Sequence, residues 1–387
     1  MPIKIRFIII TWAIITNLNI LAQKINNSPF NYNALLTADY VGIFSGGIKK
    51  GNGGLADMSL QMEFDTKKAG WWQGGTFFTY FLYDHGFKPS PYVGSNQTFD
   101  NIETDDNFQF FEYWYKQRFT RGFIEIGQSN INTEFFHSNQ GCRLINSNFN
   151  TQPDITLNAH VPIFSKATLG FKFRYDFSQK INIYGCVYNG YEGTPEDNPY
   201  NTTFYFRKKD GLLYMVESQF FFNDSSNTNL KVGAWLHTGL FLNSADSSYH
   251  DDRSGVYLLA EKNLIHYSKD NFGLGVFLMT GYLPTNYVII HWYAACGVTL
   301  TGILMKKTTD ILVLGITTNR LDKSMANNSS NDKVFNESLA ELSWQLPINK
   351  YITVQPDLQY FLNPGASKNI DHAFIGIIRV LLNVSSK

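Results

Sequence analysis

Residues 352–362 read Ile-Thr-Val-Gln-Pro-Asp-Leu-Gln-Tyr-Phe-Leu, and apolar and polar side chains alternate along most of this run. The even-numbered positions, from Ile352 to Leu362, are apolar or aromatic, whereas all the odd-numbered positions except Phe361 are polar. Successive side chains of a β-strand point to opposite faces, so this period of two predicts a strand with one apolar face and one polar face.

The same alternation recurs elsewhere in the chain. Further examples are residues 169–175, 230–237, 292–301 and 340–346. In the first of these, Phe171 and Phe173 oppose Lys172 and Arg174. Repeated amphipathic strands of about ten residues are typical of a transmembrane β-barrel, with lipid outside and water inside. Residues 77–83 are apolar or aromatic at nearly every position, and the sequence does not orient them.

The first 22 residues resemble a secretory signal peptide. Lys4 and Arg6 precede a mostly apolar stretch, and Leu21-Ala22-Gln23 offers cleavage after a small residue. We therefore expect residues 1–22 to be a signal peptide and residues 23–387 to form the exported domain. Beyond the leader no apolar run reaches the about 18 residues that a membrane helix needs. Since main-chain groups in lipid must be paired within the protein, such a chain is either soluble or a closed barrel.

Counting amphipathic segments predicts an all-β fold, a closed antiparallel transmembrane β-barrel of about 16 strands. The predicted strands are 34–45, 55–65, 74–84, 107–118, 122–129, 167–177, 181–189, 211–222, 230–241, 255–264, 272–282, 290–302, 311–320, 338–346, 352–362 and 372–384.

The connections between these strands alternate in length. Short turns occur at 176–180 and near Lys350, whereas polar connections rich in Asn, Asp and Ser occur at 190–210, 243–254 and 322–337. Short periplasmic turns and long outer loops are typical of outer-membrane barrels. The longest gap, residues 131–166, is predicted to fold into the lumen as a constriction loop, because a gap of this length within a compact domain is usually functional.

Composition excludes several other classes of protein. The chain carries 32 basic and 32 acidic residues, so its charge gives no reason to expect nucleic acid as a partner. Cys142, Cys186 and Cys296 are too few and too scattered for a disulfide framework or a thiolate metal site. We therefore expect no cofactor and no metal.

Several blocks of the chain resemble the carbohydrate-selective porin family of the OprB type. They begin with Tyr40-Val-Gly-Ile-Phe-Ser-Gly-Gly and include Phe111-Glu-Tyr-Trp-Tyr-Lys-Gln and Asn132-Thr-Glu-Phe. Later blocks are Leu230-Lys-Val-Gly-Ala-Trp-Leu-His-Thr-Gly and Gln355-Pro-Asp-Leu-Gln-Tyr. The resemblance rests on the order of these blocks, which is the same in this chain as in the family over nearly the whole mature chain.

The resemblance implies an outer-membrane porin of a Gram-negative bacterium that lets carbohydrates diffuse through a water-filled pore. It also implies contact with outer-membrane lipid and lipopolysaccharide, and a homotrimer. The chain departs from the family at three points, the first being Tyr113, which stands where the family pattern has Leu. Lys116 stands where the family has Glu, and the chain ends on Lys387 rather than near a terminal aromatic residue.

A sugar channel needs aromatic faces for the CH surfaces of sugars, interleaved with groups that hydrogen-bond hydroxyls. Candidate sugar-binding residues on the inward faces of strands and on the long loop are Glu112, Trp114, Glu134, Arg143, Trp235 and His237. A different interpretation stays open for each: lumenal acid–base pairs often only neutralise charge, and tryptophans also serve as anchors of a barrel at the membrane interface.

Two other functions remain open at this point. One is a general diffusion porin for small hydrophilic solutes, and the other is a secreted, soluble β-rich carbohydrate-binding protein or hydrolase. The sequence contains neither a Gly-x-Ser-x-Gly elbow nor a His-Glu-x-x-His zinc motif, so we expect no enzyme.

Overall fold

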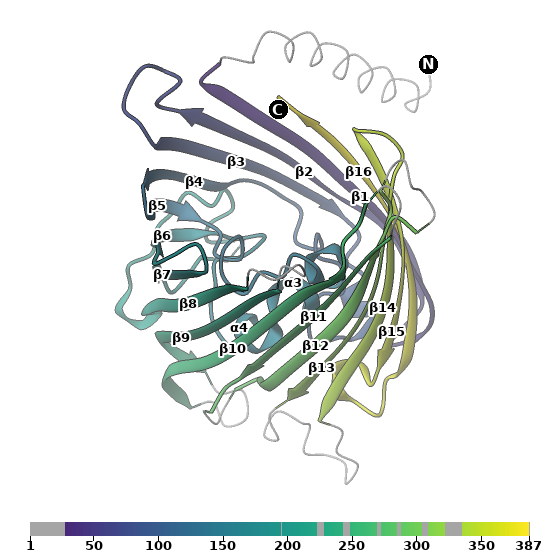
Figure 1. The fold of residues 1–387 in the computed structure, drawn as a ribbon. Helices are drawn as coiled ribbons and strands as arrows, with labels where there is room; N and C mark the ends of the chain where they lie inside the picture. The colour runs from purple at the N-terminus through teal and green to yellow at the C-terminus, as the bar shows by residue number, and fades with distance from the viewer. Residues whose placement is uncertain are drawn as a thin grey trace, which may run out of the picture.

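The computed structural model describes residues 28–194, 196–222, 228–242, 248–268, 272–284, 288–303, 309–321 and 335–386. Its strands form one closed antiparallel barrel in which each strand pairs with its neighbours in sequence and the last pairs with the first (Figure 1). The prediction of a sixteen-stranded closed barrel is confirmed. The predicted signal peptide lies outside the described residues.

The sixteen strands are β1 (Phe30–Gly47), β2 (Gly51–Asp65), β3 (Gly75–Gly86), β4 (Asn107–Phe119), β5 (Gly122–Ser129), β6 (Thr168–Asp176), β7 (Ile181–Asn189), β8 (Leu212–Phe222), β9 (Thr228–Leu242), β10 (Tyr249–Ile265), β11 (Gly273–Tyr282), β12 (Ile290–Thr301), β13 (Ile311–Leu321), β14 (Asn336–Pro347), β15 (Ile352–Leu362) and β16 (Asp371–Ser385).

The helical elements are short: α2 (Ser90–Val93), η1 (Gly141–Arg143), α3 (Asn148–Thr151), α4 (Pro153–Thr156), η2 (Lys208–Asp210) and η3 (Pro364–Ala366). None of the helices in the described ranges is both long and apolar enough to cross a membrane.

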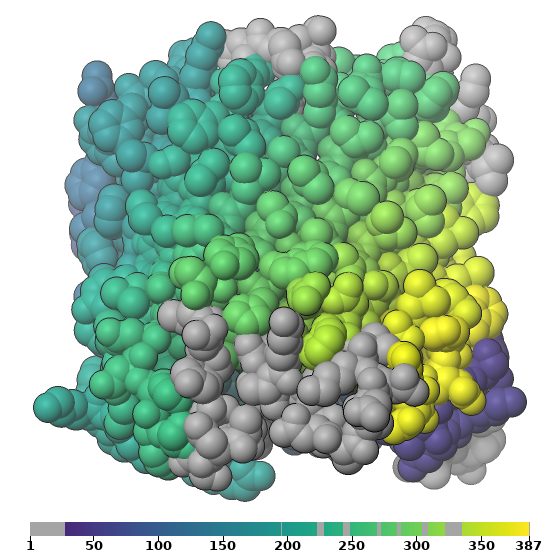
Figure 2. All heavy atoms as spheres, turned by 90° about the horizontal axis from the view of Figure 1, so that it is seen from below, coloured from purple at the N-terminus to yellow at the C-terminus, as the bar shows by residue number. Residues whose placement is uncertain are grey.

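The barrel closes where β1 meets β16. Their antiparallel register runs from the Asn33 and Ser385 pair to the Gly47 and Asp371 pair, with irregularities after Ile43. Figure 2 shows the outer wall with the purple first strand lying beside the yellow last strands. A closed barrel leaves no unpaired sheet edge, which is what a β-structure in lipid requires.

The two faces of the wall have the polarity that the sequence predicts. In β15, Leu358 and Tyr360 are 43% and 42% exposed on the outer side, whereas Gln359 between them is 0% exposed. The apolar side chains therefore face outward and the polar ones face the interior. This arrangement suits lipid outside and would leave a soluble protein with a large apolar surface.

Strand boundaries agree with the sequence prediction to the residue for β5, β7 and β15. The largest difference is β10, which was predicted to begin at residue 255 and begins at Tyr249. Residues 249–253 are mostly polar, and a bulge lies between Asp251 and Arg253. A bulge interrupts the period of two, and hence the alternation does not reveal the start of this strand.

The structure also orients β3, which the sequence left open. Phe77 and Tyr83 are 42% and 44% exposed on the outer face, whereas Leu82 is 0% exposed. The neighbouring strand β4 has an irregularity opposite the step from Tyr80 to Phe81. Both faces of β3 carry aromatic residues because Phe78 and Tyr80 of the inner face pack against rings of β4.

In an antiparallel barrel, the connections that follow odd-numbered strands lie at one end, which we call the long-loop end. The connections that follow even-numbered strands lie at the other end, which we call the short-turn end. Two long-loop connections, residues 87–106 and 130–167, turn inward. Figure 1 shows α3 and α4 of the second loop inside the ring of strands, where α4 contacts β11 and β12 and α3 contacts β13. Part of the long loop therefore lies within the ring of strands, and the constriction role predicted for residues 131–166 stays a prediction.

Candidate functional site

Three inward-facing glutamates of the wall hold the main chain of the inward loop. Glu217 on β8 accepts a hydrogen bond from the Phe136 N–H at 2.8 Å. Glu261 on β10 accepts from the Gln140 N–H at 2.9 Å. Glu341 on β14 accepts from the N–H of Ile145 at 2.5 Å and of Asn146. A carboxylate is a strong acceptor for otherwise unpaired loop amides, so these contacts fix the path of the loop.

Donors of the wall bind the loop carbonyls in the same way. Lys231 donates to the His137 carbonyl at 2.7 Å, and Arg253 donates to the Asn158 carbonyl at 2.7 Å. Gln355 donates to the carbonyl of Arg143 at 2.9 Å. Many polar residues of the inner faces therefore satisfy the loop backbone instead of facing solvent.

Wall glycines make room for the loop. A Cβ atom added at Gly281 on β11 would lie 1.9 Å from a carboxylate oxygen of Asp154. One added at Gly315 on β13 would lie 2.5 Å from Leu144 and 2.8 Å from Phe149. The loop therefore packs directly against the main chain of these strands, and any side chain at either position would push it away.

A four-charge cluster anchors the start of the inward loop to β4, β5 and β6. Lys172 lies 2.9 Å from Glu125 and 2.7 Å from Glu134, and Lys116 lies 2.9 Å from Glu125 and 3.6 Å from Glu134. Burial disfavours the charge of Glu134, but the two lysines outweigh it and hold the pKa of this carboxyl below its ordinary value. Glu134 thus stays ionised and ties the loop to the wall.

The other inward loop, residues 87–106, is held by Arg379 of β16. This guanidinium donates to Asp39 of β1 at 2.7 and 2.9 Å, to Asp100 at 3.0 Å and to Asn101 at 2.8 Å. Gln97 of this loop donates to Thr151 of the longer loop at 2.8 Å. The two loops therefore support each other as well as the barrel seam.

Glu112 and Trp114 lie together on the inner face of β4, as predicted. The indole N–H of Trp114 donates to Glu112 at 3.0 Å, and the Lys116 ammonium lies 4.8 Å from the indole ring. The ring stacks on Phe78 of β3, with centroids 4.6 Å apart and planes at 18°. Trp114 is half-buried, so this aromatic pair presents a face to the lumen.

Trp235 and His237 also face inward, but the long loop covers Trp235, and His237 is bound by the β7–β8 connection. Trp235 is 3% exposed and packs in a cluster that includes Phe136 and Ile155 of the loop. His237 is 1% exposed, and its ring bridges the Gly190 carbonyl at 3.1 Å and the Gly239 N–H at 3.1 Å. The Gly239 N–H donates to Nδ1, so the histidine is neutral and carries its proton on Nε2. In this conformation Trp235 packs within the structure, whereas His237 also borders a pocket of about 370 Å³ at the long-loop end.

Arg143 lies in η1 of the long loop, half-buried. It borders a pocket of about 370 Å³ that Glu261 and Asn263 of β10 also line. Its carbonyl is bound by Gln345 and Gln355, whereas its side chain borders open space. Of the six predicted residues, the structure groups Glu112, Trp114 and Glu134 near one part of the wall and places the other three elsewhere.

The family model of carbohydrate-selective porins of the OprB family matches residues 50–383. The chain belongs to this family. Among solved structures, the high-pH structure of Pseudomonas putida OprB matches with a TM-score of 0.82 and 14% identity over 94% of this chain and 96% of that one. The low-pH structure of the same protein matches with a TM-score of 0.60 and 13% identity over 94% and 95%.

Salmonella typhi OmpF in complex with daunomycin matches with a TM-score of 0.58 and 8% identity over 93% of this chain and 99% of that one. No curated protein matches the chain. At such low identities the solved structures show a common fold. Family membership and the fold together identify an outer-membrane carbohydrate porin of the Gram-negative type.

Sequence reasoning missed the wall residues that hold the loop of this porin, namely Glu217, Glu261 and Glu341. Each stands at a polar position of an alternating strand, and that signal marks them as inward without showing what they bind. It also missed Phe78, because β3 could not be oriented. Among the described residues no group of three or more His, Cys, Asp or Glu side chains is arranged to hold a metal ion.

Proposed function

We propose that sugars cross this porin along the wall of β3 and β4, where Trp114 and Phe78 form an aromatic step. The observation that carries the proposal is the stacking of these two rings at 4.6 Å with Glu112 and Lys116 beside them. Rings bind the CH faces of a sugar, and the flanking charged groups hydrogen-bond its hydroxyls. The porin acts as a passive channel without a catalytic step.

The long loop sets the width of the passage in this proposal. It fills the side of the lumen along β8 to β14, where its hydrogen bonds to Glu217, Glu261 and Glu341 lie. Glu134 and Trp235 contribute by positioning this loop rather than by touching solute, whereas His237 fixes the β7–β8 connection at Gly190. Arg143 remains a proposed solute contact on the pocket that it shares with Glu261.

The test is sugar uptake into liposomes that contain the purified porin, with mono- and oligosaccharides of increasing length. One ring contact is worth about 1 kcal/mol, or roughly a fivefold change in affinity. We expect Trp114→Ala to weaken the preference for sugars over equally large polyols by about this factor, and Trp114→Phe to retain most of it. Tyr83→Ala, on the lipid-facing side of β3, is the matched control and should change nothing.

A general diffusion porin is the alternative function, and the same assay separates the two. If Trp114→Ala leaves the relative uptake of all sugars and polyols unaltered, the channel sorts solutes by size alone. A fully water-soluble protein recovered without detergent would exclude both.

We also propose that the apolar outer wall contacts outer-membrane lipid and lipopolysaccharide, and that the porin forms a homotrimer. The exposed apolar side chains of the outer faces, such as Leu314 and Ile316 at 51% and 53% exposure, support the lipid contact. Family resemblance supports the trimer. The mass of the porin in mild detergent, measured by sedimentation, tests the assembly.

A further inference from the structure

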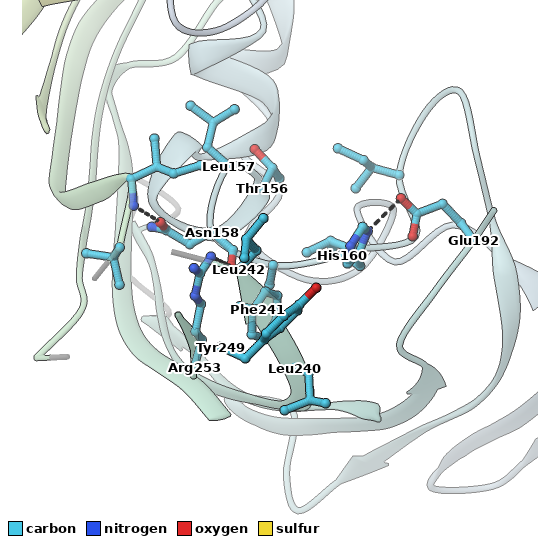
Figure 3. A pocket seen from close by; sticks show the side chains of 15 residues that line it. Thr156, Leu157, Asn158, His160, Glu192, Leu240, Phe241, Leu242, Tyr249 and Arg253 are labelled. Atoms are coloured by element: carbon cyan, nitrogen blue, oxygen red, sulfur yellow. Dashed lines mark hydrogen bonds and ion pairs between the residues drawn. The ribbon is translucent and has the colours of Figure 1, made fainter. Parts of the chain in front are cut away.

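A pocket of about 520 Å³ opens at the long-loop end of the barrel, apart from the aromatic step (Figure 3). Its walls come from five parts of the chain, one of which is the β11–β12 connection with Val288 and Ile289. The inward loop supplies His160, the β7–β8 loop supplies Glu192, the end of β9 supplies Phe241, and the start of β10 supplies Tyr249 and Arg253. A second pocket of about 370 Å³ adjoins it and shares His160 and Tyr249. Both volumes are in the usual range for small-ligand sites.

Aromatic rings of several elements meet around this pocket. His160 lies nearly parallel to Phe241, with centroids 6.4 Å apart and planes at 17°, and it meets the edge of Tyr191 at 5.4 Å. Tyr249 is 69% exposed, and its ring extends toward His160 in Figure 3. Phe241 is buried, with the guanidinium of Arg253 4.2 Å from its ring. The exposed rings of His160 and Tyr249 offer flat faces beside open space, which is what the CH face of a sugar ring requires.

The polar groups of the two pockets are already organised by each other. His160 lies 3.2 Å from an oxygen of Glu192, and Arg207 lies 2.7 Å from Asp210. These pairs present donors and acceptors side by side, and Arg253 and Lys209 add further donors. Such a mixture is suited to the hydroxyl groups of a sugar, which both donate and accept hydrogen bonds. Because its geometry is already fixed, the site loses little conformational entropy when it binds a ligand.

One acceptor lacks a donor. The Oε2 atom of Glu192 is shielded from solvent and has no hydrogen-bond partner among the residues that the structure describes. A buried acceptor without a donor costs free energy, and a ligand hydroxyl that reaches it would recover that cost. This atom, together with the rings, points to a ligand that combines hydroxyl groups with an apolar face.

We propose that this pocket is a capture site at the channel mouth, where the terminal ring of a neutral oligosaccharide binds before it enters the lumen. The inference rests on the proposed function, since it supplies the solute for the aromatic step. Long loops of outer-membrane barrels face the exterior, so the pocket meets incoming solute first. His160 belongs to the loop that narrows the lumen, and hence a ring bound there already lies beside the passage.

The experiment is block of single-channel current in planar bilayers by maltotetraose and by cellotetraose, added to one side at a time. Tyr249→Ala and His160→Ala remove rings of the mouth, whereas Tyr249→Phe keeps the ring. Tyr282→Ala removes an exposed ring from the outer face of β11 and is the matched control. Ion conductance without sugar verifies that each variant forms the same channel.

We expect both alanine variants to lower the association rate from the long-loop side about three- to tenfold, the range for loss of one aromatic contact. The rate from the short-turn side, the conductance, and the rates of Tyr249→Phe and Tyr282→Ala should stay as in the wild type. Unchanged association from the long-loop side in both alanine variants would overturn the capture site.

Trp114→Ala distinguishes a failure of this inference from a failure of the proposed function. It should weaken block from both sides, because the aromatic step lies within the shared passage. If sugar blocks Trp114→Ala as it blocks the wild type but blocks Tyr249→Ala more weakly, the capture site is supported and the aromatic step is refuted. If block is weakened in Trp114→Ala but unchanged in Tyr249→Ala, the aromatic step is supported and the capture site is refuted.

Discussion

Asp154 of the inward loop is the most informative single residue for testing how the loop is held. It is 0% exposed, lies in α4 against β11 and β12, and neither carboxylate oxygen has a hydrogen-bond partner among the described residues. Burial raises the pKa of its carboxyl from 3.8 to about 8. The closed loop therefore carries a protonated, neutral Asp154 at neutral pH.

The sign of the pH effect follows from the proton count. Release of the loop into water returns the pKa of Asp154 to its ordinary value, so the released loop binds fewer protons than the closed loop between pH 3.8 and about 8. The closed state is therefore favoured fully below this window and loses stability as the pH rises through it. Above about pH 8 both states are ionised, and no further loss occurs.

The slope is about 1.36 kcal/mol for each pH unit inside the window. Raising the pH from 5 to 7 should therefore weaken closure by about 2.7 kcal/mol, or about a hundredfold in the opening equilibrium. The assay is amide hydrogen exchange of peptides from residues 148–158 in detergent-solubilised porin, with rates corrected for the intrinsic effect of pH. Asp154→Asn has nearly the same shape and no titration, so its corrected protection should be independent of pH.

The reasoning fails if Asp154→Asn retains the pH dependence of the wild type, because the slope then comes from another group. It also fails if the corrected protection of the wild type is flat between pH 5 and 7. Peptides of the outer wall, such as those from β15, serve as the internal control and should show no slope in either protein.

Three further substitutions test other contacts. Glu261→Ala removes acceptors for the loop and should cost about 2–4 kcal/mol of closure, seen as faster exchange at residues 138–142 and noisier channel current; unaltered exchange would contradict the anchoring role. Gly281→Val should displace the loop and raise conductance, whereas Gly54→Ala, whose added Cβ has its nearest neighbour at 3.6 Å, should do neither. Arg379→Ala leaves Asp39 buried without its cation and should lower stability by about 3–5 kcal/mol in thermal unfolding; an unchanged midpoint would refute this.

Much of the fold could be predicted from the sequence alone because the polarity of each strand residue matches the environment that its side chain faces. Lipid contacts every outward side chain directly, so apolar residues must recur at every second position wherever the wall meets the membrane. The alternation in 352–362 therefore predicted both the extent of β15 and the orientation of its faces. It failed at the start of β10 and in β3, where a bulge or inner-face rings remove the contrast between faces.

The candidate site shows the limit of this reasoning. Trp114 and Trp235 stand at equivalent inward positions of alternating strands, yet one presents a face to the lumen and the other is covered by the long loop. The contacts that decide this difference join residues far apart in the chain, such as Phe136 with Glu217 across 81 positions and Ile145 with Glu341 across 196. The local alternation of polar and apolar residues gives no information on such long-range hydrogen bonds.

The sequence by itself thus predicted a barrel, its strand number, and which side of the alternating strands faces lipid, since these depend on the polarity of one residue and its near neighbours. The tertiary structure alone decided which inward residues meet solvent and which hold a loop. That choice depends on where a long connection comes to rest, and its resting place is set by the summed hydrogen bonds, recesses and buried charges of many distant strands.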